Sequence, residues 1–282
     1  MSAHAIETPS GKGATDENFP VGSFLLARPL RPHVATFYAF ARAADDIADN
    51  PALAPQQKID RLDAFEHALV HGSDDPELAK ADRLRNSLAA SRVTPAHARD
   101  LLAAFRQDAV KTRYASWDEL MAYCRLSASP VGRYLLDLHG EDPADYAVSD
   151  PLCDALQVIN HLQDCVEDWR EMDRVYLPAD WMAAHGTGID DLGAPALTPG
   201  MRAALDRCLD GCEALMVQAR QMPARLKSRR LGAESAVIVA LADRLIAALR
   251  AGDPVAGRVA LSKPRMAMIA AGAALRFAVA RR

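Results

Sequence analysis

The sequence predicts an all-α protein whose helices surround an apolar interior. Half of its 282 residues are hydrophobic, which excludes a mostly disordered chain because there is enough apolar surface to bury. Ala, Leu and Arg dominate, while β-branched runs and the alternating apolar and polar positions typical of strands are missing. The net charge of −4, from 33 Lys+Arg and 37 Asp+Glu, provides no basic surface, so we expect no nucleic-acid partner.

The chain is expected to form one domain over residues 18–282. Residues 1–17 are small and polar and predict a flexible tail without a secretory signal. The helical pattern then continues almost throughout, with no internal repeat and no run long enough for a membrane span. Five cysteines are too few and odd in number for a secreted disulfide scaffold, so we interpret them as reduced core thiols in a cytosolic protein. They are Cys124, Cys153, Cys165, Cys208 and Cys212.

Proline and capping residues predict where the first helices begin and end. Pro32 suits the first turn of a helix that runs to about Asn50, where Pro51 and Pro55 break the chain. Further along, Ser116 and Glu119 have the spacing of a capping box, which predicts a helix start at the next residue.

In the second half of the chain, Pro130 and Gly132 are expected to kink or break the helix that they enter. Pro151 is expected to open another helix that extends to about Arg170. Residues 185–199 are rich in Gly and Pro and predict a surface loop. Three helical segments follow, at about 200–221, 231–251 and 262–280. The apolar run 266–280 in the last segment is too short for a membrane span, so we expect this helix to be buried in the protein rather than to lie at an interface.

The first informative segment places four polar residues on one face of a helix. At about 100° per residue, Tyr38, Arg42, Asp45 and Asp49 fall within about 60° of one another. The apolar residues between them, such as Ile47, point the other way and provide a surface for packing. A narrow polar stripe between apolar flanks predicts a cavity wall rather than a face in open solvent.

A second segment repeats this arrangement later in the chain. Gln157, Asn160, Asp164 and Asp168 span about 80° of a helical wheel and are surrounded by apolar residues. Aspartates four residues apart destabilise a helix by about 0.2–0.5 kcal/mol, so neither pair is explained by helix stability. One such pair usually lies on a solvent-exposed helix face, but two pairs, each beside polar residues and apolar flanks, favour a cation site.

Donor chemistry narrows the choice of cation. Carboxylate and amide oxygens favour Mg²⁺ or Mn²⁺ over Zn²⁺, and Mg²⁺ usually completes its shell with phosphate oxygens and water. Two facing stripes would therefore hold several Mg²⁺ ions around a diphosphate, with Arg42 and Arg174 in direct contact with it.

Other candidate residues have simpler explanations. His161 beside Asn160 is more often a core histidine than a ligand, and Cys208 and Cys212 more often pack in a core than bind a metal. The Glu-x-x-His pairs of a di-iron bundle are missing, and no Gly-x-Gly-x-x-Gly follows a strand, so no nicotinamide cofactor is expected.

The two polar segments resemble the paired aspartate motifs of the squalene/phytoene synthase family, all-α class I terpenoid synthases. The resemblance covers the chain from Asn18 to about Arg276. It includes the residues after the second motif, Arg174-Val175-Tyr176-Leu177-Pro178. It also includes a helix that lines the family's pocket, matched here by Arg113-Tyr114, Tyr123-Cys124 and the broken stretch 127–132. It implies the single-domain isoprenoid synthase fold, with helices around a central apolar cavity.

Within that family, the sequence is most similar to the branch that forms hydroxysqualene in bacterial hopanoid synthesis. The stretch Glu17-Asn18-Phe19-Pro20-Val21-Gly22-Ser23 and residues 40–49 carry this resemblance. Gln163 stands where many coupling members carry Arg, which suits a substrate with one diphosphate. The resemblance implies Mg²⁺-dependent conversion of presqualene diphosphate and water to hydroxysqualene and diphosphate, without NADPH.

The resemblance also implies roles for individual residues. The expected Mg²⁺ ligands are Asp45, Asp49, Asn160, Asp164 and Asp168. The expected substrate contacts are Ser23, Tyr38, Arg42, Gln157, Arg174 and Tyr176. Tyr123 is expected to join Asp45 and Asp168 in catalysis, where it or the helix-break carbonyls near Ser129 would stabilise positive charge or guide the water.

Two other functions stay open at this point. One is head-to-head condensation of two prenyl diphosphates, as in a squalene, dehydrosqualene or phytoene synthase. The other is a non-catalytic lipid-binding relative, which the two intact aspartate motifs argue against. The expected location is the cytoplasm, with peripheral contact at the inner face of the membrane left open. The expected partners are a prenyl diphosphate and other enzymes of the squalene pathway.

Overall fold

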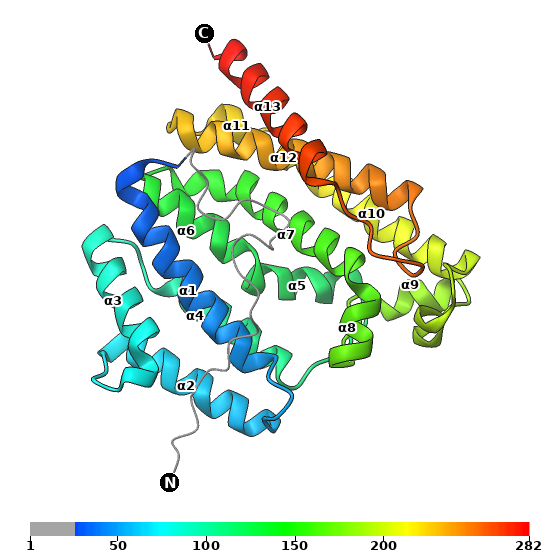
Figure 1. Ribbon diagram of the computed structural model, residues 1–282, viewed down its shortest axis with the longest axis horizontal. Helices are drawn as coiled ribbons and strands as arrows, with labels where there is room; N and C mark the ends of the chain where they lie inside the picture. The colour runs from blue at the N-terminus through cyan, green and yellow to red at the C-terminus, as the bar shows by residue number, and fades with distance from the viewer. Residues whose placement is uncertain (1–25, 282) are drawn as a thin grey trace.

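The computed structural model describes residues 26–281, and this part of the chain is helical, with one isolated bridge between Arg113 and Val175 in place of any strand. Figure 1 shows the arrangement. The α-helices are α1 (Arg31–Ala48), α2 (Pro55–His71), α3 (Ala79–Ser91), α4 (Ala96–Asp108), α5 (Trp117–Ser127), α6 (Ser129–His139), α7 (Tyr146–Gln163), α8 (Cys165–Met172), α9 (Ala179–Ala184), α10 (Pro199–Ala219), α11 (Met222–Arg225), α12 (Arg229–Ala251) and α13 (Lys263–Ala280). Short 3-10 helices are η1 (Arg28–Leu30), η2 (Pro76–Leu78), η3 (Pro143–Asp145) and η4 (Ile189–Gly193).

Helix α7 lies at the centre of the fold (Figure 1). It packs along α10 and α6, and α5 and α12 also contact it. Five of its six buried apolar residues recur at intervals of three and four, which places them on one side of a helix. These five are Val148, Leu152, Ala155, Ile159 and Leu162, and the sixth is Val158. A second group of packed helices forms where α1 contacts α2, α3 and α4.

The predicted ends of the first helices are confirmed. Helix α1 covers Arg31–Ala48, and α2 begins at Pro55. The Ser116 hydroxyl accepts the Glu119 N–H at 3.3 Å and caps the start of α5 as predicted, while the Glu119 carboxylate accepts the N–H of Ala115, one residue before the cap.

The predicted helix break is also confirmed. Helix α5 ends at Ser127 and α6 begins at Ser129, with Ala128 between them at φ −120° and ψ −51°. Pro130 has no N–H to donate to the Leu126 carbonyl, which removes one hydrogen bond at this place. All five cysteines are unpaired, as expected for reduced thiols.

The expected helix from Pro151 to about Arg170 is wrong at both ends. Helix α7 begins at Tyr146, and Pro151 lies inside it, where the missing N–H costs only the bond to the Ala147 carbonyl in the first turn. The helix ends at Gln163. Asp164, at φ −105° and ψ 10°, separates α7 from α8, so the second polar segment is not one continuous helix.

The expected burial of the C-terminal helix is also wrong. Of the residues in α13, Ala273 alone is buried, and Met268 is 70% exposed. The reason is that α13 packs mainly on the outer side of α12 and projects beyond the bundle (Figure 1). The predicted tail 1–17 lies outside the described residues.

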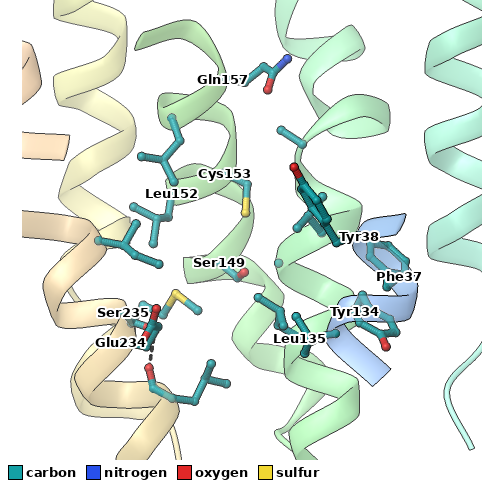
Figure 2. Close-up of a pocket in the computed structure, with 18 of the residues that line it drawn as sticks. Phe37, Tyr38, Tyr134, Leu135, Ser149, Leu152, Cys153, Gln157, Glu234 and Ser235 are labelled. Carbon is teal, nitrogen blue, oxygen red and sulfur yellow. Dashed lines mark hydrogen bonds between the residues drawn. The ribbon is translucent and has the colours of Figure 1, made fainter. Parts of the chain in front are cut away.

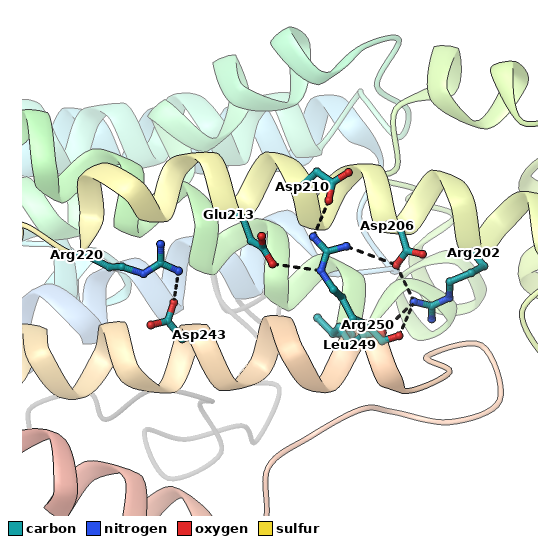
Figure 3. Close-up of polar contacts among 8 residues, drawn as sticks. All are labelled: Arg202, Asp206, Asp210, Glu213, Arg220, Asp243, Leu249 and Arg250. Carbon is teal, nitrogen blue, oxygen red and sulfur yellow. Dashed lines mark hydrogen bonds and ion pairs between the residues drawn. The ribbon is translucent and has the colours of Figure 1, made fainter.

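Ion pairs join α10 and α12 along their exposed edges (Figure 3). Arg250 contacts Asp210 at 2.6 Å and Glu213 at 3.2 Å, and Arg220 contacts Asp243 at 2.7 Å. Such exposed pairs contribute at most about 1 kcal/mol each, so the apolar contact beneath them holds the two helices together. This contact positions α12 beside the central cavity.

Candidate active site

An apolar cavity of about 300 Å³ lies between α1, α5, α6, α7 and α12 (Figure 2). Gln157 marks one end in that view, and Glu234 and Ser235 of α12 mark the other. The polar segments of α1 and α7 both reach its wall, since Tyr38, Gln157 and Asn160 line it. The remaining wall is mostly apolar, which suits a hydrocarbon ligand.

The first polar segment lies on α1 as predicted. Phe40 and Ile47 are fully buried on the opposite face of the helix, which fixes its rotation. Arg42 forms ion pairs of 3.0 Å with both Asp45 and Asp46. The charges of this segment are therefore partly balanced within one helix.

The second polar segment divides at Asp164. The Asp164 carboxylate pairs with Arg258 at 2.5 Å, and the neighbouring Gln163 side chain donates to the Val259 carbonyl at 2.6 Å. Both partners lie on the connection between α12 and α13. Arg258 was not predicted from the sequence, because its position next to Asp164 depends on the tertiary fold.

His161 is a core histidine, as favoured above. It is 9% exposed, and its ring stacks on Tyr176 with centroids 3.4 Å apart. The Gln157 side chain lies 3.1 Å from its Nε2, and Asp168 lies 3.8 Å from its Nδ1. His161 therefore connects Gln157 to Asp168 across the helix break.

Arg174 joins the two polar segments. Helix α8 ends at Met172, the next residue, Asp173, takes the left-handed conformation (φ 51°), and this turn directs Arg174 back toward α1. Its guanidinium lies 2.6 Å from the Asp49 carboxylate and donates to the Asp108 carbonyl at 3.1 Å. Its backbone N–H donates to the Asp168 carbonyl at 3.1 Å, so Arg174 links the end of the second segment to Asp49 of the first.

Asp108, at the end of α4, is a buried carboxylate that sequence reasoning missed. It is 6% exposed, one oxygen accepts the Tyr123 hydroxyl at 2.9 Å, and the other has no partner among the described residues. Burial raises its pKa to about 7, against the opposing effect of Arg174. A lone aspartate outside any spaced pattern gave no signal in the sequence.

Tyr123 lies in an aromatic cluster beside the cavity rather than in its wall. Its ring is 5.4 Å from that of Tyr114 and 5.7 Å from that of Tyr176, measured between centroids. Burial and the nearby Asp108 carboxylate raise the pKa of Tyr123 well above its usual value, so its hydroxyl stays protonated and donates to Asp108.

Asp45 provides the test of whether a divalent cation fits here. Its side chain is 31% exposed, and partial burial together with the Asp49 carboxylate raises its pKa to about 8. Repulsion among clustered carboxylates is what a divalent cation relieves, and the oxygen donors suit Mg²⁺. Within residues 26–281, no three acidic, His or Cys side chains converge closely enough to hold a metal, and two of the carboxylates, Asp49 and Asp164, pair with arginines.

Three of the expected site residues, Tyr38, Gln157 and Asn160, line the cavity. The others have contacts outside its lining: Asp45 with Arg42, Asp49 with Arg174, Asp164 with Arg258, Tyr123 with Asp108, and Asp168 and Tyr176 with His161. Ser23 lies outside the described residues, so the structure does not place it.

The chain is similar to known proteins along almost its full length. The family model for squalene/phytoene synthase matches residues 13–265. A hydroxysqualene synthase of Rhodopseudomonas palustris is 44% identical over 99% of this chain and 94% of the relative, and one of Sinorhizobium fredii is 42% identical over 92% and 88%. The crystal structure of squalene synthase HpnC from Alicyclobacillus acidocaldarius matches with a TM-score of 0.72 and 31% identity, over 82% of this chain and 87% of that chain.

Proposed function

This chain belongs to the squalene/phytoene synthase family, whose members process prenyl diphosphates and generally depend on divalent metals, and we propose that it converts presqualene diphosphate and water to hydroxysqualene and diphosphate. The observation that carries the proposal is the similarity to hydroxysqualene synthases over almost the whole chain. Two acidic segments beside one apolar cavity support it, because they suit a ligand with a diphosphate head and a hydrocarbon body. Residues 18–282 would act as one catalytic domain.

The proposed metal is Mg²⁺, as several ions, with Asp45, Asp49, Asn160, Asp164 and Asp168 as ligands. Bound Mg²⁺ would supply charge neutralisation for the departing diphosphate. Arg174 and Arg258 pair with two of these carboxylates, and we propose that both guanidiniums turn from them toward the diphosphate when a metal binds. The released guanidiniums would then face the diphosphate oxygens, which match their planar donors.

The remaining polar residues would orient the substrate. Tyr38 and Gln157 line the polar end of the cavity, where the diphosphate would enter. Arg42 lies beside Asp45 on the same helix, and Tyr176 stacks on His161 behind Gln157. Ser23 is proposed as a further contact from the sequence resemblance alone.

The apolar cavity would control the fate of the carbocation that forms when the diphosphate leaves. Its mostly apolar wall limits the number of waters that reach the cation. Tyr123 and its partner Asp108 lie next to the polar end, where the Tyr123 oxygen would stabilise positive charge or orient the water that adds. Addition of water forms the C–O bond and releases one proton, so no reductant is needed and no NADPH is proposed.

A two-substrate assay tests this function. Purified protein with Mg²⁺ receives either presqualene diphosphate or farnesyl diphosphate, and we expect hydroxysqualene from the first and no product from the second. Product from farnesyl diphosphate alone would identify a coupling enzyme instead. Absence of turnover with either, together with retained lipid binding, would identify a non-catalytic relative.

The proposed partners follow from the substrate. A C30 isoprenoid diphosphate and its alcohol product partition into lipid, so we propose a cytoplasmic protein with peripheral contact at the inner face of the membrane. Other enzymes of the squalene pathway would supply its substrate and use its product. Among the residues that the structure describes, no helix is long and apolar enough to cross a membrane.

A further inference from the structure

Helix α13 carries an exposed apolar stripe on its outer face. Met268, Leu275 and Val279 are 70%, 67% and 62% exposed, although large apolar side chains are usually buried. Their spacing of seven and four residues places them within about 40° of one another on a helix. We call these three residues the α13 stripe.

The packing of α13 fixes the stripe on the outside of the molecule. Ala273 and the partly buried Met266 and Ile269 pack on the core from the other side of the helix. Phe277 contacts α12 at Gly232, where a Cβ atom would lie 2.7 Å from the ring and would not fit. Rolling the helix to bury the stripe would therefore expose these residues and break this contact.

Basic side chains border the stripe, and the end of the chain has no opposing charge. Residues 254–282 contain no Asp or Glu, although the whole chain has a net charge of −4. Arg265 and Arg276 lie along one edge of the stripe, and neither has an ion-pair partner within residues 26–281. Arg281 anchors the end of the helix by donating to the Ala224 and Leu226 carbonyls at 2.7 and 2.6 Å.

We propose that the α13 stripe docks this protein on an anionic lipid bilayer, with Met268, Leu275 and Val279 among the acyl chains and Arg265 and Arg276 at the headgroup phosphates. An apolar stripe with flanking cations and no acidic residue is the pattern of a helix that lies in the membrane interface. The proposal rests on the proposed function, because that function gives the chain a lipid substrate and a lipid product.

The position of α13 would also bring the cavity close to the lipid. Leu231, Glu234 and Ile238 of α12 line the cavity, and α13 packs on the same helix from outside. Two helices, α13 and α12, would therefore lie between the bilayer and the end of the cavity that lies away from Gln157. Docking there would shorten the path between lipid and cavity.

A second copy of the chain is a less favourable occupant. A twofold contact through this face would bring Arg265 and Arg276 of both copies near each other, and the absence of acidic residues in 254–282 leaves these charges uncompensated. Anionic lipid headgroups would provide the negative charge that Arg265 and Arg276 need.

Vesicle flotation of the full chain tests the proposal. Vesicles of equal parts phosphatidylglycerol and phosphatidylcholine should carry the protein, and vesicles of phosphatidylcholine alone should carry at least about tenfold less. The triple variant M268S/L275S/V279S should lose about tenfold in binding to the anionic vesicles, and R265Q/R276Q should lose most of the difference between the two compositions. The matched control V70S/V110S/V217S removes three exposed valines elsewhere and should bind as the unmodified chain does.

Two results would overturn the inference. The first is a triple variant that floats as well as the unmodified chain. The second is an unmodified chain that does not float and instead forms a dimer, by light scattering, that the triple variant loses. Turnover of detergent-dispersed presqualene diphosphate is measured separately, so a chain that turns over but does not float refutes the docking alone. A chain that floats but does not turn over refutes the proposed function alone.

Discussion

The two acidic segments reach the same end of the cavity by different routes. The first lies on one uninterrupted helix, α1, and its Arg42 pairs locally with Asp45 and Asp46. The second is divided at Asp164, between α7 and α8, and Asp164 takes its partner, Arg258, from a connection 94 residues later. One segment is therefore set by local sequence, and the other by tertiary contacts.

This difference shows which arginines balance the charges of the two segments. Arg174 is buried and holds Asp49, whereas Arg258 is 45% exposed on its side chain. A buried guanidinium contributes more to stability than an exposed one, because water does not replace its hydrogen bonds. The following variants test the comparison, beginning with the largest expected effect.

The largest expected effect is a loss of turnover when either acidic segment loses one carboxylate. Asp45→Asn on α1 and Asp168→Asn on α8 should each lower kcat/KM with presqualene diphosphate by at least about 10²–10³-fold, since each removes a charge that would hold the metal. Asp60→Asn, on the exposed surface of α2, is the control. A variant of either segment with unchanged turnover would show that one segment alone holds the metal.

Loss of the buried guanidinium should have the next largest effect. Arg174→Gln should lower the free energy of unfolding by about 1.5–3 kcal/mol in urea denaturation, because Asp49 and the Asp108 carbonyl lose a charged donor. Arg174→Lys retains the charge and should lose less. A stability equal to the parent in Arg174→Gln would contradict the bridging role.

Asp108 should give the metal-free protein a pH-dependent stability. Its pKa rises from 3.8 to about 7 on folding, so its protonated form favours the folded state, and this contribution is lost as pH rises from about 4 through about 7. Asp108→Asn stays neutral and should be more stable than the parent at pH 8, by about 1–3 kcal/mol, with no gain at pH 3. Thermal unfolding of both proteins with a metal chelator at pH 3 and pH 8 measures this difference in stability. An equal gain for Asp108→Asn at the two pH values would contradict the raised pKa of Asp108.

The smallest effect is expected for the exposed guanidinium. Arg258→Gln should change the free energy of unfolding by less than about 1 kcal/mol, because its pair with Asp164 is solvent-exposed. In the same urea series, the loss for Arg258→Gln should be smaller than the loss for Arg174→Gln. A larger loss for Arg258→Gln would contradict the greater contribution of the buried guanidinium.

Local sequence predicted the parts of the site that depend on one helix. The stripe from Tyr38 to Asp49 follows from helical periodicity, and the start of α5 follows from the Ser116 cap. The break at Asp164 has no proline or glycine to mark it, so periodicity extended the helix too far.

Residues placed by tertiary contacts were beyond such reasoning. Asp108 enters the site because α4 ends there, and Arg258 because its connection packs on the end of α7. Burial of α13 was predicted from its apolar composition, but no helix covers its outer face in the described part of the chain. The composition of a helix shows how much apolar surface it could bury, but it does not show whether another helix packs on that surface.

A crystal structure with Mn²⁺ and inorganic diphosphate would test most directly whether the two acidic segments form one metal site. Anomalous scattering should place Mn²⁺ between α1 and α8, with Asp45 or Asp49 on one side, Asn160, Asp164 or Asp168 on the other, and one diphosphate between them. Arg174 and Arg258 should have left the carboxylates that they now contact. Mn²⁺ bound to a single segment, or diphosphate bound with both ion pairs intact and no metal, would contradict the account.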